Sequence, residues 1–92
     1  MPLPGRRRIG LELARGPSVE SVRLSWDLLR DRHGELLNEL APRYRVTSAA
    51  GNERFRLIAG PLLSPQKAGQ LCDALKAEKY SCEVTVFSGD AL

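Results

Sequence analysis

The chain lacks several features that would place it in a common functional class. None of its apolar runs approaches the roughly 20 residues needed to cross a bilayer, so we expect no membrane insertion by this segment. It has one histidine, His33, and two cysteines, Cys72 and Cys82, which are too far apart for a CxxC redox motif. A zinc site would need further ligands, and glycine-rich phosphate-binding motifs are absent. The sequence therefore predicts no metal and no cofactor.

Catalytic groups are equally scarce. His33 falls on the apolar stripe of the first expected helix, where a histidine is more often a core-edge residue than a base. The carboxylates of Glu12, Glu53 and Glu83 belong to separate expected strands, with no sign of pairing. We therefore expect that the protein is not an enzyme.

The size and charge of the chain indicate one globular domain with a basic N-terminal flank. Its 92 residues leave no room for a second core, and the net charge is +3. The run Arg6-Arg7-Arg8 could contact nucleic acid or anionic lipid, but we interpret residues 1–8 as a flexible, solvated flank. MPLPGRRR lacks the apolar region of a signal peptide. If the domain works outside the cytoplasm, we expect its targeting or anchor segment in a longer parent chain.

Periodicity predicts strand, helix, strand and strand in the first two thirds of the chain. Residues 8–15 alternate like a half-buried strand, which Gly16-Pro17 ends. Ser18 is a good N-cap for a helix whose apolar residues recur every three or four positions. Residues 43–48 and 53–59 alternate on either side of a turn and predict a hairpin.

The rest of the chain predicts a second helix and a last strand. Ser64 caps this helix, and Pro65 occupies its first position, where a missing N–H costs nothing. Residues 82–86 alternate as a strand, and residues 88–92 are expected to be a C-terminal tail. The order βαββαβ predicts an α+β, ferredoxin/RNP-like two-layer sandwich over residues 9–87. In it a four-stranded antiparallel sheet carries two helices on one face and meets solvent on the other.

The two cysteines fall on inward positions of neighbouring elements. Cys72 lies on the apolar stripe of the second helix, and Cys82 begins the inward face of the last strand. The short loop between them brings their Cβ atoms within disulfide reach. We favour a disulfide, which would indicate an oxidising compartment, over the alternative of two buried free thiols.

Nucleic-acid binding receives little support. RNA-recognition motifs share the order βαββαβ and stack bases on aromatic residues of the sheet. The outward positions of the expected hairpin carry no aromatic residue and the RNP1 pattern is absent; these positions are Arg45, Thr47, Arg56 and Ile58. We expect no nucleic-acid partner and keep a cytosolic nucleic-acid binder, using the arginines of the flank and hairpin, as the less favoured alternative.

Residues 9–87 resemble the sporulation-related repeat (SPOR) domain. Domains of that family have two halves, each with a strand followed by a helix. The segment 55–62, FRLIAGPL, is similar to the strand of the second half, commonly YRVRVGPF. Residues 64–75 and 80–86 resemble the helix and the strand that follow it. In the first half LELA at residues 11–14 stands in place of a V-Q-L-G pattern. Ser18-Val19-Glu20 with Trp26, and the positions of both cysteines, are similar to a bacterial subgroup of the family.

This resemblance implies a non-catalytic domain of the bacterial cell envelope or periplasm. Such domains bind peptidoglycan glycan strands stripped of their stem peptides, which accumulate at division sites, and contact them through the exposed sheet face. The resemblance therefore implies a role in cell division or wall remodelling. The alternative is a protein-interaction module that uses the same face, or an apolar patch at Ile58, to bind an envelope or division partner. As a domain, we expect a monomer.

The candidate glycan-binding residues follow from position on this face. Glu12 stands where the family has a polar residue, Arg56 matches an outward arginine, and Ile58 stands where a second arginine is common. Alternation alone adds their neighbours Arg45, Thr47 and Thr85. Such side chains can hydrogen-bond the hydroxyl and acetamido groups of a glycan.

Overall fold

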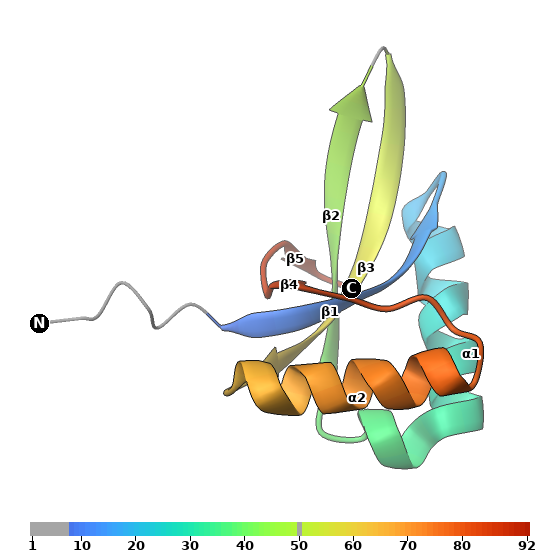
Figure 1. The fold of residues 1–92 in the computed structure, drawn as a ribbon. Helices are drawn as coiled ribbons and strands as arrows, with labels where there is room; N and C mark the ends of the chain where they lie inside the picture. Colours follow the sequence, from blue (N-terminus) through green and yellow to red (C-terminus); the bar gives the residue numbers. More distant parts are fainter. Residues whose placement is uncertain (1–7, 50) are drawn as a thin grey trace, which may run out of the picture.

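The computed structural model describes residues 8–49 and 51–92 (Figure 1). Most of the expected N-terminal flank, including Arg6 and Arg7, lies outside the described residues. The elements in chain order are β1 (Ile9–Gly16), α1 (Val19–Leu37), β2 (Ala41–Ala49), β3 (Asn52–Leu62), α2 (Pro65–Ala77), β4 (Glu83–Val86) and β5 (Asp90–Ala91).

The protein has an α+β fold with two helices and one antiparallel sheet, as the sequence predicts. The sheet has five strands in the order β4-β1-β3-β2-β5, so the prediction of four strands is wrong in number. The additional strand, β5, pairs with β2 through Arg43 opposite Ala91 and Tyr44 opposite Asp90. It lies in the segment 88–92 that was expected to be a tail, because two residues are too few to show a strand periodicity.

Both helices begin where the sequence predicts. The side chain of Ser18 accepts a hydrogen bond from the backbone N–H of Ser21, and the Ser21 hydroxyl accepts one from the N–H of Ser18. Ser64 accepts a hydrogen bond from the N–H of Lys67, with Pro65 at the start of α2. These bonds satisfy backbone donors that the first helical turn leaves free.

The main core lies between the helices and one face of the sheet. Its buried residues come from β1, α1, β3 and α2 and from the segment before β4, and include Leu11, Trp26, Leu57, Leu75 and Cys82. Trp26 is 4% exposed, which fits the expectation of core packing. His33 sits at the core edge with its ring edge-on to Tyr80, at 4.9 Å between centroids, and its backbone is non-helical (φ −132°, ψ 39°).

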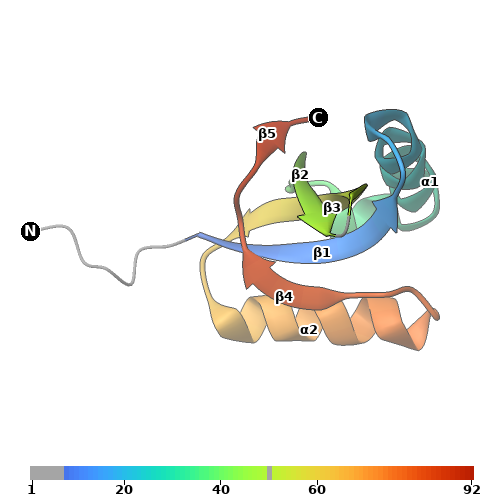
Figure 2. The same ribbon diagram turned by 90° about the horizontal axis from the view of Figure 1, so that it is seen from above.

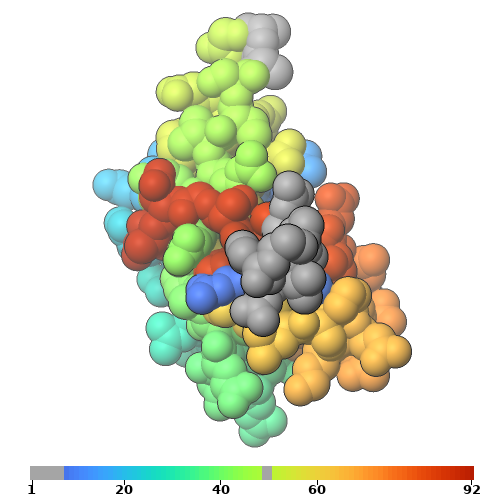
Figure 3. Space-filling view, turned by 90° about the vertical axis from the view of Figure 1, so that its left-hand side faces the viewer, coloured from blue at the N-terminus to red at the C-terminus, as the bar shows by residue number. Residues whose placement is uncertain are grey.

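The C-terminal segment crosses to the other side of the sheet. In Figure 2 the chain leaves β4, passes over β1 and reaches β5 on the side away from α1. Figure 3 shows these residues, in red, lying across that face of the molecule. We call the sheet surface opposite the helices the outer face, and the segment from Phe87 to Leu92 the C-terminal strap. The strap divides the outer face into a covered part and an open part.

Candidate functional site

Three arginines lie side by side on the open part of the outer face. The register pairs Arg15 of β1 with Arg56 of β3, and Arg56 with Arg45 of β2. We call these three residues the arginine row. Adjacent strands lie about 4.8 Å apart, so the row extends over roughly 10 Å of the sheet.

A bulge in β1 brings Arg15 into this row. Glu12 pairs with Ile58 and Ala14 pairs with Leu57, so the register of β1 against β3 shifts between them. Ala14, which simple alternation places on the outer face, therefore packs against the main core. Arg15 follows it onto the same side as Glu12. Sequence reasoning missed Arg15 for this reason.

Glu12 connects two members of the arginine row. Its Oε2 accepts a hydrogen bond from Arg15 Nε at 2.7 Å, and its Oε1 accepts one from Arg56 Nη1 at 3.2 Å. The residue is 8% exposed, so the two ion pairs compensate a carboxylate that is largely withdrawn from water. The hydrogen bond to Glu12, reinforced by its charge, raises the pKa of Arg15. Arg56 Nε is buried and has no hydrogen-bond partner among the described residues.

The covered part of the outer face is apolar. Ile58 is 1% exposed and Phe87 is 8% exposed, and neither belongs to the main core on the helix side. A Cβ atom at Gly60 would lie 2.8 Å from Phe87 Cδ1, and one at Gly10 would lie 2.7 Å from Ile58 Cγ2. The two glycines therefore allow the strap to lie close to the sheet. We call Gly10, Ile58 and Gly60 the apolar seat.

Arg43 closes over the seated ring. Its guanidinium carbon lies 4.5 Å from the centroid of Phe87, a cation–π distance, and its Nη1 donates to the Gly89 carbonyl at 3.3 Å. Ile58 was expected on an open surface as a ligand contact or as an apolar docking patch. Both expectations for Ile58 are corrected by its burial, because the strap fills the space above it.

The other predicted site residues have different degrees of access. Arg45 is exposed beside Arg56, and Thr47 is half-buried with its hydroxyl donating to the Arg54 carbonyl at 3.4 Å. Thr85 is half-buried on β4, opposite Gly10, so it lies by the apolar seat and away from the arginine row. The structure thus brings Glu12, Arg45 and Arg56 together, places Thr47 at the edge of the group and separates Thr85 and Ile58 from it.

A groove of about 370 Å³ opens beside the arginine row. The pairing of β1 with β4 ends at Glu12 opposite Glu83, and the segment before β4 then diverges from β1. The groove is lined by Glu12, Leu13, Ala14, Arg15, Ser81, Cys82 and Glu83. It offers carboxylate, guanidinium and hydroxyl groups to a ligand in contact with Arg15 and Glu12.

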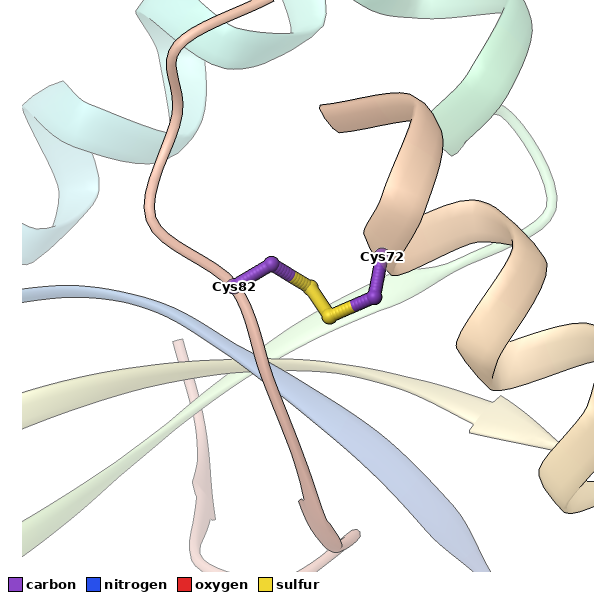
Figure 4. Close-up of a disulfide and its surroundings, with 2 residues drawn as sticks. All are labelled: Cys72 and Cys82. Carbon is purple, nitrogen blue, oxygen red and sulfur yellow. A yellow bond between two sulfur atoms is a disulfide. The ribbon is translucent and has the colours of Figure 1, made fainter. Parts of the chain in front are cut away.

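A disulfide supports one wall of this groove. Cys72 of α2 is bonded to Cys82, with 5.4 Å between their Cα atoms (Figure 4). The predicted pairing is therefore confirmed, and the described residues include no free cysteine. The bond fixes the segment before β4 against α2, and it is compatible with an oxidising compartment.

The described part of the chain contains no helix with the length and apolarity needed to cross a membrane. It also contains no group of three or more histidine, cysteine, aspartate or glutamate residues placed to hold a metal ion.

Comparisons of this chain with models of known protein families, with curated proteins and with solved structures give no match.

Proposed function

We propose that this domain is a non-catalytic binding module for glycan strands of bacterial peptidoglycan, working in the periplasm or cell envelope during division or wall remodelling. The observation that carries the proposal is the open polar strip on the outer face, where Glu12 and the arginine row adjoin a groove. Hydroxyl and acetamido groups of a glycan can hydrogen-bond to such a strip without a deep pocket. The strands β4-β1-β3-β2 follow a ferredoxin-like order, with β5 as an addition. The resemblance of the sequence to SPOR domains also supports glycan binding.

The proposal is tested by co-sedimentation with purified sacculi, either intact or stripped of stem peptides by an amidase. We expect the protein to be retained preferentially on stripped sacculi, with the partial loss of retention at high salt that screening of a few exposed guanidinium contacts produces. Phosphate contacts, by contrast, lose affinity steeply with salt.

Arg45→Ala is the most informative variant for locating the site. Arg45 is exposed and takes part in no ion pair among the described residues, so its removal leaves the Glu12 contacts in place. We expect retention on stripped sacculi to fall about fivefold, the scale of one exposed polar contact. Arg23→Ala, on the exposed side of α1, is the matched control and should bind like the original protein. Equal retention of both variants would show that the outer face is not the binding site.

A protein-interaction module is the second candidate, and the free edge of β4 favours it. β4 pairs only with β1 among the described strands, and it exposes Val84 at 49% and Val86 at 40%. Exposed edge strands with apolar side chains can accept a strand from another chain. Absence of retention on both kinds of sacculi would favour this candidate over glycan binding.

A further inference from the structure

We infer that the arginine row recognises carboxylates, so that the preferred ligand is a glycan strand with free carboxylate groups along its length. The inference rests on the proposed function and names the chemical group that selects the ligand. Hydrolysis of the amide bond that joins a stem peptide to muramic acid leaves the lactyl carboxylate of that sugar free. A stripped glycan therefore carries repeated carboxylates that an intact, peptide-substituted strand lacks at the same positions.

The balance of charge on the open strip supports an anionic ligand. Arg15, Arg56 and Arg45 are neighbours across three strands, and like charges placed directly opposite one another are unfavourable. Glu12 compensates one charge while it contacts two of the three arginines, and Glu83, opposite Glu12 on β4, compensates a second. The strip therefore keeps one net positive charge. Guanidinium groups also bind carboxylates in a bidentate manner, which makes arginine well suited to this recognition.

Access to these arginines is sufficient for binding. The side chain of Arg15 is 52% exposed and that of Arg56 is 36% exposed, so both reach the surface while they contact Glu12. Arg15 also lines the groove of about 370 Å³, so its guanidinium group borders a space that a ligand can enter. The pairing with Glu12 holds both guanidinium groups in place before a ligand arrives, which reduces the entropy lost on binding.

The same face is poorly suited to a nucleic acid. Single-stranded nucleic acids need aromatic platforms on which their bases stack. The tryptophan, both tyrosines and Phe55 all contact the main core on the helix side, and Phe87 is held beneath Arg43.

The test compares stripped sacculi before and after chemical removal of their negative charge. Carbodiimide with ammonia converts free carboxylates to primary amides, and mock-treated sacculi serve as the reference. We expect amidation to lower retention of the protein at least fivefold. Chitin, a neutral polymer with acetamido groups and no carboxylates, should retain the protein no better than the amidated sacculi.

The Arg15→Gln variant tests whether the loss of retention on amidated sacculi depends on the arginine row. We expect this variant to bind mock-treated sacculi about fivefold less well than the original protein, and amidation to cause little further loss. Arg23→Gln on α1 removes the same charge from the opposite layer and should keep the full response to amidation. Circular dichroism of both variants establishes that they remain folded.

The outcomes separate this inference from the proposed function. No retention on mock-treated stripped sacculi overturns both. Strong retention that is unchanged by amidation overturns the inference and leaves glycan binding in place. Tighter binding of a single-stranded oligonucleotide than of stripped sacculi, at the same salt concentration, overturns the inference in favour of a nucleic-acid ligand.

Discussion

Glu12 is the residue on which the arrangement of the open strip depends. It lies on β1 with 8% of its surface exposed, in the interior of the sheet order β4-β1-β3-β2-β5. A carboxylate withdrawn from water is costly unless it is paired, and Glu12 pairs with Arg15 and Arg56 at once. The three side chains therefore form a preorganised unit, in which Glu12 positions the two guanidinium groups that we propose contact the ligand.

Gly10 is a second residue whose identity the packing requires. A Cβ atom there would lie 2.7 Å from Ile58 Cγ2 and 3.1 Å from Phe87 Cα. The second neighbour is backbone, so it cannot move aside by changing rotamer. We predict that Gly10→Ala lowers the free energy of unfolding by about 1–3 kcal/mol, the usual cost of overpacking, as measured by urea denaturation.

Gly69 provides the matched control for Gly10. It lies within α2, and a Cβ atom at this position would meet nothing within 4 Å. Alanine loses less backbone entropy than glycine on forming a helix, so Gly69→Ala should raise the free energy of unfolding by about 0.5–1 kcal/mol. Similar destabilisation by both substitutions would contradict the account of the apolar seat.

At the scale of elements, the sequence predicts where the helices start and the order of helices and strands better than it predicts the register between strands. Ser18 and Ser64 mark the helix starts because capping is a local interaction, and both predicted caps form. The bulge between Glu12 and Ala14 leaves no such local mark. Alternation predicts which side a residue faces only when no residue is inserted, and an insertion depends on the partner strand. This is why Arg15 was absent from the predicted site.

The disulfide is the element-scale feature with the clearest consequence for stability. It joins α2 to the segment before β4 across a sequence separation of 10 residues. Restricting the unfolded chain over a loop of this size contributes about 2–3 kcal/mol. We predict that a reducing agent lowers the free energy of unfolding by this amount in urea titrations. The double variant Cys72→Ala/Cys82→Ala should be insensitive to the reductant, and an equal response from it would show that the reductant acts elsewhere.

For the whole molecule, the exposure of the outer face is what the sequence could not predict. Ile58 occupies an outward position by alternation, and the strand 82–86 was expected to end in a tail. Burial of Ile58 requires contact with Phe87, which lies 29 positions later in the chain. It also requires Gly10 and Gly60 to leave room for the strap, although their local sequence indicates only a strand residue and a turn residue. No local periodicity records such a long-range contact. The outward positions of Arg45 and Arg56 remained predictable because both side chains keep exposed surface, whereas Glu12 faces the same way but is 8% exposed and paired with two arginines.

The strap leads to a prediction about which of its contacts holds it in place. Phe87 fills the apolar seat beneath Arg43, whereas β5 adds only two paired positions to β2. We predict that Phe87→Ala lowers the free energy of unfolding by about 3 kcal/mol, the scale of a buried aromatic ring. A chain that stops after Gly89 should lose about 1–2 kcal/mol, because it gives up the β5 pairing and the partial burial of Leu92 but keeps the ring.

Urea denaturation of the two variants measures this difference directly. The truncated chain retains Phe87 in its seat and the hydrogen bond from Arg43 to Gly89, so Ile58 stays covered. The backbone amide of Ile58 should therefore remain protected from hydrogen exchange in the truncated chain. The same amide should become less protected in the Phe87→Ala variant. A truncation that costs as much as the loss of the ring, with Ile58 equally deprotected, would show that β5 pairing holds the strap. In that case, loss of the β5 pairing alone would release the strap from the outer face, because the contacts of Phe87 would be too weak to hold it.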